Sequence, residues 1–144
     1  MTLHLIKLSV GPETLADLAR WQNARLKEKK KKREPLLLQH ITRMTPKRGD
    51  QLLDGGSIFW VIRGQIMCRE RILDIRPFTD KEGIHRCRLV LDPKCVLVEP
   101  RPRSAFQGWR YLLPKDAPPD ITDPRSAKNL PEALKSELAE LGLL

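Results

Sequence analysis

The sequence predicts a single α+β domain spanning residues 1–144, with a mixed, mainly antiparallel sheet between an N-terminal and a C-terminal helix. We expect this sheet to curl, or to close into a small β-barrel. A chain of 144 residues is long enough for one hydrophobic core. In its middle part, short segments of alternating apolar and polar residues are separated by turn residues, as in antiparallel strands. Towards both ends, apolar residues recur at helical spacing instead.

The N-terminal part predicts a strand followed by a helix. Four of the six residues 3–8 are apolar, which indicates a mostly buried strand. Gly11 and Pro12 then open a helix predicted over 12–33. Pro35 ends that helix, because proline and the residue before it are both unfavourable in a helix interior.

A second strand and a short helix come next. The apolar segment 36–41 forms the predicted strand. Thr45 is the expected N-cap of the helix, with Pro46 at its first position. The glycine pair at 55–56 ends it.

The middle of the chain supplies most of the predicted sheet. Strands are expected at 57–63, 66–76, 84–91, 95–98 and 106–113. Residues 99–103 contain two prolines, which cannot donate to a strand ladder, so this segment is expected at a sheet edge. Residues 114–129 predict a proline-rich wrapping loop, after which Asn129 caps a C-terminal helix.

The positive charge of the chain is concentrated in one window. Residues 20–48 hold 11 Lys and Arg against two Glu, and this accounts for the whole net charge of +9. Such a patch is typical of proteins that bind an anionic partner, nucleic acid above all. The predicted phosphate-contacting residues are Lys29, Lys30, Lys31, Lys32, Arg33, Arg43, Lys47 and Arg48. The alternative interpretation of the lysine run is a solvated helix end.

A second candidate site is the aromatic segment near residue 109. Flat rings, an amide and a cation occur together there, as in platforms on which bases stack. The residues of this possible ligand cleft are Gln107, Trp109, Arg110 and Tyr111. The alternative is a strand that closes the core with Trp109 and Tyr111 packed inward. Trp60, in the longest apolar strand, is expected in the core.

Other kinds of site have little support in the sequence. No catalytic motif is present, and no catalytic residue or cofactor is predicted. His85, Cys87 and Cys68 are too few and too irregularly spaced to predict a zinc site. The acidic residues of the middle strands are expected to be exposed and to form cross-strand ion pairs with arginines. These acidic residues are Glu70, Asp74, Asp80 and Glu82.

Three segments carry a resemblance to a known family. They read TRMTPKR at 42–48, LLDGGSIFWVI at 52–62 and FQGWRYL at 106–112, and LHLIKL at 3–8 also fits. The chain resembles an alphaproteobacterial family catalogued as domain of unknown function 1489, which implies no activity and no functional residues. The order of helix, glycines, strand, turn and long strand is also similar to the small β-barrels of the PUA-like group, many of which bind RNA or modified bases.

These observations favour a non-catalytic nucleic-acid-binding module, with RNA as the partner. One alternative is a small enzyme acting on a nucleotide or nucleobase-like ligand in a cleft near Trp109. Another is a protein-interaction module for an acidic partner. The longest apolar run, 58–62, is too short to cross a bilayer, and the N-terminus lacks signal-peptide features. We therefore expect a cytoplasmic protein without a membrane partner; the sequence leaves its oligomeric state open.

Overall fold

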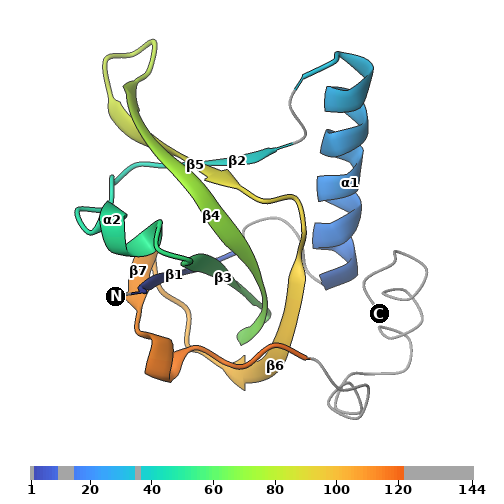
Figure 1. Cartoon of the computed structure of the whole chain (residues 1–144), viewed down its shortest axis with the longest axis vertical. Helices are drawn as coiled ribbons and strands as arrows, with labels where there is room; N and C mark the ends of the chain where they lie inside the picture. The colour runs from blue at the N-terminus through green and yellow to red at the C-terminus, as the bar shows by residue number, and fades with distance from the viewer. Residues whose placement is uncertain (1, 10–14, 35–36, 122–144) are drawn as a thin grey trace.

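The computed structural model describes residues 2–9, 15–34 and 37–121 (Figure 1). It contains seven strands, two α-helices and one 3₁₀ turn within these ranges. In chain order they are β1 (His4–Leu8), α1 (Leu15–Lys31), β2 (Leu38–Thr42), α2 (Gly49–Leu52), β3 (Ser57–Ile62), β4 (Gln65–Thr79), β5 (His85–Leu91), β6 (Val96–Pro102), β7 (Trp109–Leu112) and η1 (Pro114–Asp116). The predicted C-terminal helix and residues 122–129 of the predicted loop lie outside the described residues.

The strands form one mixed sheet in the order β2-β5-β4-β3-β1-β7, and β6 pairs with β4 beside this path. Strands β1 and β3 are parallel, whereas the other pairs are antiparallel. The predicted α+β class with a mainly antiparallel sheet is therefore confirmed. The barrel alternative is wrong, because β2 and β7 end the described sheet without pairing to each other.

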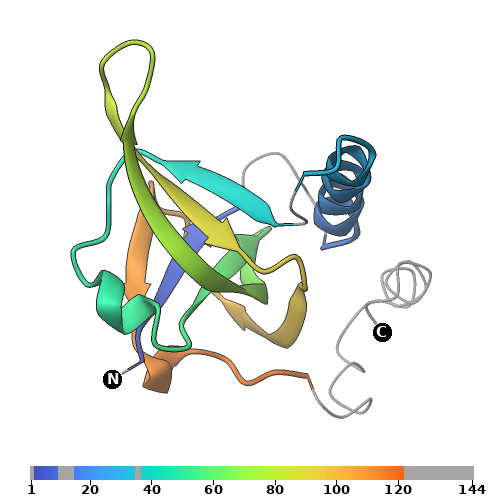
Figure 2. The same cartoon turned by 45° about the horizontal axis from the view of Figure 1, so that its top comes forward.

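Strand β4 connects the two halves of the sheet. Its first part pairs with β3 on one side and with β6 on the other, and its second part pairs with β5. The β4–β5 hairpin projects beyond the rest of the molecule (Figures 1 and 2). The tight β3–β4 turn uses Arg63 and Gly64, both with positive φ, as two-residue hairpin turns require. Strand β4 spans Gln65–Thr79 and is therefore longer than the predicted segment 66–76.

The core lies on both faces of β3, in which every residue is buried. Ile58 and Trp60 point into the larger cluster, which also contains Leu18 of α1. Phe59 and Val61 point into a smaller cluster on the opposite face. A strand covered on both faces carries a continuous apolar run rather than an alternating one, which explains the sequence of this segment.

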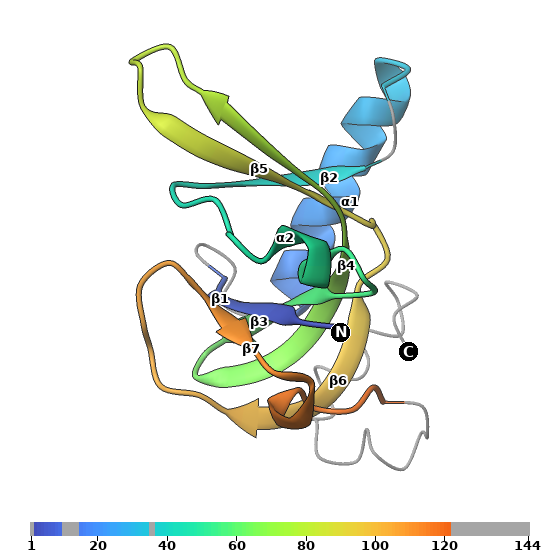
Figure 3. The same ribbon diagram turned by 60° about the vertical axis from the view of Figure 1, so that its left-hand side comes forward.

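Helix α1 stands beside the sheet next to β2 (Figures 1 and 3). It buries Leu18 and Gln22 and partly buries Leu26, which are spaced four residues apart and share one face of the helix. The predicted helix is confirmed over 15–31, and its expected first residues, 12–14, lie outside the described part of the chain.

Two predicted element bounds are wrong for identifiable reasons. Helix α2 begins at Gly49, not at Thr45 and Pro46, because the backbone N–H groups of Lys47 and Arg48 bond to the Tyr111 hydroxyl instead of starting a helix. Strand β7 covers only Trp109–Leu112 of the predicted 106–113, because it pairs with β1 over those four residues alone.

Candidate functional site

The two groups of predicted phosphate-contacting residues lie at opposite ends of β2. The lysine run ends α1 just before this strand, and Arg43, Lys47 and Arg48 follow it. A strand of five residues is about 17 Å long. Strand β2 is also the last in the sheet path and pairs with β5 alone among the described strands. The basic residues therefore flank a sheet edge.

The cations of the lysine run differ in their surroundings. The Nζ of Lys29 donates a 2.6 Å hydrogen bond to the carbonyl of Leu37 and so ties the end of α1 to the start of β2. Lys32 forms a 3.1 Å ion pair with Glu28, which raises the pKa of the lysine. The other three predicted cations of this run are exposed: Lys30, Lys31 and Arg33. They are the ones best placed to meet an anionic partner.

The predicted cleft residues Trp109 and Tyr111 anchor the loop that carries the second basic group. The indole Nε1–H of Trp109 donates to the carbonyl of Met44 at 2.8 Å. The hydroxyl of Tyr111 accepts from the backbone N–H groups of Lys47 and Arg48 at 3.0 and 3.1 Å. The structure thus brings together two sites that the sequence suggested separately.

The other two predicted cleft residues lie away from this anchor. Arg110 is exposed, and its guanidinium lies 5.0 Å from the ring centre of Phe106. Gln107 is also exposed. A hollow of about 530 Å³ is lined by Trp109 and Arg43, together with Lys7 of β1. Of the four predicted cleft residues, only Trp109 lines it.

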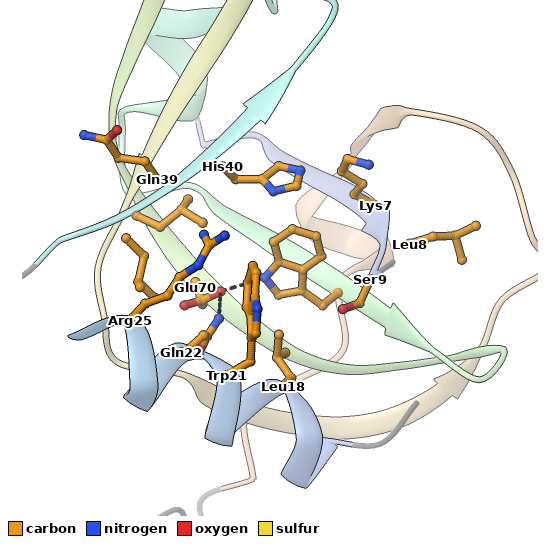
Figure 4. Close-up of a pocket in the computed structure, with 13 residues that line it drawn as sticks. Lys7, Leu8, Ser9, Leu18, Trp21, Gln22, Arg25, Gln39, His40 and Glu70 are labelled. Atoms are coloured by element: carbon orange, nitrogen blue, oxygen red, sulfur yellow. Dashed lines mark hydrogen bonds between the residues drawn. The ribbon is translucent and has the colours of Figure 1, made fainter. Parts of the chain in front are cut away.

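A smaller and more enclosed cavity of about 150 Å³ lies between α1 and the sheet (Figure 4). Its walls come from α1, from the strands β1, β2, β3, β4 and β5, and from Ser9. The lining residues are Lys7, Leu8, Ser9, Leu18, Trp21, Gln22, Arg25, Leu38, Gln39, His40, Trp60, Glu70 and Leu91. None of them had been proposed as a site residue from the sequence.

Glu70 carries the buried charge of this cavity. It is 0% exposed, which contradicts the prediction of an exposed carboxylate in a cross-strand ion pair. Its Oε1 accepts hydrogen bonds from Gln22 Nε2 at 2.8 Å and from Trp60 Nε1 at 2.7 Å (Figure 4). Its Oε2 is buried and has no hydrogen-bond partner among the described residues. Burial raises the pKa of Glu70 to about 7, although the two hydrogen bonds act to lower it.

A predicted ion pair across the hairpin is found at one other acidic residue, since Asp80 pairs with Arg86 at 2.6 Å. Asp74 pairs instead with Arg76 of its own strand at 2.7 Å, which is not the predicted cross-strand pair. Both pairs belong to the β4–β5 hairpin, whose end is well exposed to solvent. Glu70 differs from these two residues because its side chain points from β4 into the buried interior.

His40 supplies a second buried polar atom at the same cavity. Its Nε2 is buried without a hydrogen-bond partner in the described part of the chain. Burial and, to a smaller extent, the positive charges of Lys7 and Arg25 together lower the pKa of His40 to about 4. The ring is therefore neutral at pH 7, and it packs edge-on against Trp60 with a centroid separation of 5.0 Å.

The rim of the cavity is aromatic and cationic. Trp21 is 48% exposed, which is unusual for so large an apolar side chain. The guanidinium of Arg25 lies 3.7 Å from the centre of its ring, a cation–π contact that holds the indole in place. Lys7 lies on the other side of the cavity (Figure 4).

Three separate hollows lie along β2 and share lining residues, and together we call them the β2 groove. The enclosed cavity shares Arg25, Leu38 and Gln39 with a hollow of about 320 Å³ at the end of α1. That hollow shares Ile41 with the one lined by Trp109. Lys7 lines both the enclosed cavity and the Trp109 hollow. The groove runs from one group of basic residues to the other.

One sequence signal could have revealed the enclosed cavity. Cys68, Glu70 and Ile72 occupy alternate positions of one strand, so Glu70 replaces an apolar residue on an inward-facing side. An acidic residue in such a register is rarely buried without a specific reason. Trp21 and His40 gave no comparable signal, because their approach to Glu70 depends on how α1 and β2 pack.

The described residues contain neither a metal-binding group of side chains nor a membrane-spanning helix. No group of three or more His, Cys, Asp or Glu side chains is arranged to hold a metal ion within 2–9, 15–34 and 37–121. In the same ranges, neither helix has the length and apolar character needed to span a membrane.

Comparison of the chain with curated proteins and with solved structures gives no match. A family model does match, over residues 5–144, and its description is protein of unknown function (DUF1489). This match covers both basic groups, every residue of the enclosed cavity and all the strands but the first residue of β1. The chain therefore belongs to the DUF1489 family.

Proposed function

We propose that this protein is an RNA-binding module that holds a single strand along the β2 groove. The observation that carries the proposal is the row of hollows along β2 between two groups of exposed cations. Lysine and arginine contact phosphates without reading sequence, so these groups would fix the strand at both ends. Between them, the exposed face of Trp21 offers a surface on which a base can stack.

The charge distribution supports an anionic partner. Charge that only kept the protein in solution would be spread over the whole chain. The window 20–48 contains the whole net charge of +9. Strand β2, along which the groove lies, falls within this window. A single strand suits this surface better than a duplex does, because its bases are free to enter hollows beside an edge strand. This is the physical basis for proposing a single strand rather than a duplex.

The proposal is tested by fluorescence anisotropy with a short labelled RNA of mixed sequence at several salt concentrations. If about five phosphates are neutralised, the logarithm of the association constant should fall against the logarithm of salt with a slope of about −3 to −4. A duplex DNA and a polyglutamate peptide serve as competitors. Tighter binding of the peptide would favour an acidic protein partner and contradict the proposal.

Three double variants locate the binding surface. Lys30→Gln with Lys31→Gln removes two cations at one end of the groove, and Arg43→Gln with Lys47→Gln removes two at the other. Each pair should reduce the magnitude of the salt slope by about 1.4, since each lost phosphate contact on a single strand is worth about 0.7. The matched control, Lys81→Gln with Lys94→Gln, removes two exposed lysines far from β2 in the sequence. An equal loss in the control would show that only net charge matters.

A second candidate function is an enzyme that acts on a nucleotide or nucleobase. The observation favouring it is Glu70, since a buried carboxyl with a pKa of about 7 is suited to general acid–base chemistry. Incubation of the protein with single nucleotides, followed by chromatography, distinguishes this function from binding. A change in the nucleotide that is lost in Glu70→Gln would favour the enzyme.

A further inference from the structure

A second cluster of positive charge lies outside the basic window, in and beside the segment that joins β6 to β7. Residues 100–115 hold four Lys and Arg and no Asp or Glu, and acidic residues elsewhere in the chain offset these charges in the total. The four cations are Arg101, Arg103, Arg110 and Lys115, of which all but Arg103 are exposed. The segment lies at the margin of the molecule (Figure 3). A surface run of cations without acidic neighbours is suited to binding an anion.

Two of these cations meet at one aromatic ring. The guanidinium carbons of Arg103 and Arg110 lie 5.2 and 5.0 Å from the centre of the Phe106 ring. They are therefore no more than about 10 Å apart, a separation that two N–H···O bonds to one phosphate group can span. The face of an aromatic ring attracts a cation, so contact with Phe106 keeps both guanidinium groups close to each other.

Strand pairing and packing fix the positions of all three residues. The backbone N–H of Arg103 donates to the carbonyl of Gly64 at 2.8 Å, which ties this residue to the β3–β4 turn. Arg110 lies in β7, opposite Ile6 of β1. Phe106 packs against the smaller core cluster. The two cations are therefore carried by ordered parts of the fold, which lowers the entropy cost of binding a ligand.

The charges of Arg103 and Arg110 are not neutralised within the described part of the chain. Neither guanidinium forms a hydrogen bond or an ion pair with an acidic side chain there. Arg69 of β4, by contrast, makes two 2.7 Å bonds to the carboxylate of Asp120. Two like charges at one ring repel each other, and an anion between them would replace that repulsion with two attractive contacts. Guanidinium groups match the oxygens of phosphate with paired N–H donors, so phosphate is the anion that suits this site.

The two arginines lie on the opposite side of β7 from the β2 groove. Successive residues of a strand point to opposite faces, so Arg110 faces away from the side that carries Trp109. Gly108 and Trp109 line the last hollow of the groove, whereas Phe106 packs on the other face of the sheet. We propose that Arg103 and Arg110 form a second phosphate-binding site, which holds the backbone of the RNA strand where it leaves the groove and passes β7. This inference rests on the proposed function.

Inorganic phosphate tests the site without RNA. The Nε–H signals of the arginine side chains are followed in the ¹H–¹⁵N spectrum of the full chain, with chloride keeping the ionic strength constant. Millimolar phosphate should shift the signals of Arg103 and Arg110, whereas the exposed Arg71 of β4 should stay in place. Arg110→Gln should weaken the phosphate response of Arg103 at least about tenfold, because it removes one of the two charged donors.

RNA length tests the path of the strand. An RNA of about five nucleotides supplies the phosphates assigned to the groove, whereas one of about twelve can reach both sites. With the longer RNA, Arg103→Gln combined with Arg110→Gln should reduce the magnitude of the salt slope by about 0.7, the value of one lost phosphate contact on a single strand. The shorter RNA should bind this variant like the parent. The matched control, Arg71→Gln with Lys81→Gln, removes two exposed cations outside both sites and should change neither slope.

The outcomes separate this inference from the proposed function. The second site is overturned if phosphate shifts Arg71 as much as Arg103 and Arg110, or if the double variant keeps the parent's slope with the longer RNA. Salt-dependent binding of the shorter RNA in either case would leave the β2 groove intact as the binding surface. Selective phosphate shifts without binding of either RNA would sustain the phosphate site and overturn the RNA module.

Discussion

The two oxygens of the Glu70 carboxyl differ in their hydrogen bonds. Oε1 accepts two, whereas Oε2 accepts none from the described residues. Its Oε1 fixes the orientation of Gln22 and Trp60, so the side chain joins α1, β3 and β4. Burial favours the protonated form and raises the pKa of this carboxyl to about 7. Glu70 is therefore present in both the protonated and the ionised form near neutral pH.

The raised pKa of Glu70 predicts that this residue contributes to the pH dependence of stability. Glu70→Gln should remove that contribution. The pKa of Glu70 is about 7 in the folded protein against an ordinary value of 4.5, so the folded state keeps a proton that the unfolded state has lost. Stability therefore falls as pH rises through this range, by about 3 kcal/mol in total. Between about pH 5 and about pH 8, the free energy of unfolding measured with urea should therefore fall by about 3 kcal/mol more in the parent than in the variant.

A second buried residue makes the comparison between the two proteins necessary. The pKa of His40 is lowered to about 4, so His40 contributes stability in the opposite direction, rising with pH until its unfolded value is passed. This contribution is present in both proteins and cancels in their difference. Parallel pH profiles for parent and variant would show that Glu70 is ionised throughout and would contradict the assignment.

At the scale of elements, the loop between β2 and α2 depends on the strand that lies farthest from it in the sequence. Tyr111 of β7 accepts from two successive backbone N–H groups of this loop, and Trp109 donates to a third residue. The cations at 43–48 are therefore held at the end of the groove by aromatic side chains more than 60 residues away. Their position would otherwise depend on a flexible loop.

Tyr111→Phe tests this anchor while keeping the ring. The variant loses the hydroxyl that accepts from Lys47 and Arg48, so these two amides should exchange with solvent faster. Because water can replace the lost acceptor at this exposed loop, the loss of stability should stay near about 1 kcal/mol. Amide exchange measured by NMR provides the readout, with the β3 amides as internal controls. Unchanged exchange at 47 and 48 would mean that the loop is held by other contacts.

The turn from α2 into β3 requires a residue without a side chain at one position. A Cβ on Gly56 would lie far inside van der Waals contact with the carbonyl oxygens of Leu3 and Leu52. Gly56→Ala should therefore cost at least about 3 kcal/mol, because backbone atoms must move. The matched variant is Gly49→Ala in α2, where the new Cβ would be 3.5 Å from Ile75 Cδ1, an ordinary contact.

The two alanine variants should change stability in opposite directions. Gly49→Ala should be neutral or stabilising by about 0.5–1 kcal/mol, since alanine is the better helix former. The urea midpoints of the two variants provide the measurement. Similar midpoints would show that the approach of Gly56 to Leu3 relaxes without cost.

Sequence patterns predicted the elements better than their bounds. The strand segments and α1 follow from alternation and helical spacing, which depend on local geometry alone. The start of α2 and the length of β7 could not be predicted in this way. Both are set by contacts between residues more than 60 positions apart, namely the Tyr111 hydroxyl and the pairing with β1.

At the scale of the whole molecule, the charge pattern located a region but not the site within it. The basic window correctly drew attention to residues 20–48, which surround β2 in the structure. The enclosed cavity could not be predicted, because Trp21, His40, Trp60 and Glu70 come from four different elements. In the sequence, each of these residues can be interpreted as an ordinary member of its own helix or strand. Only the packing of α1 against the sheet brings them together.

The position of β1 in the sheet also bears on how the chain folds during synthesis. It lies between β3 and β7, which follow it in the chain by roughly 50 and 105 residues. Its backbone groups cannot be paired until those later strands have left the ribosome, and contacts of such long range slow folding. The apolar residues Leu5 and Ile6, which are buried in the folded protein, stay unburied in the growing chain for that time, and such surface favours aggregation before folding is complete.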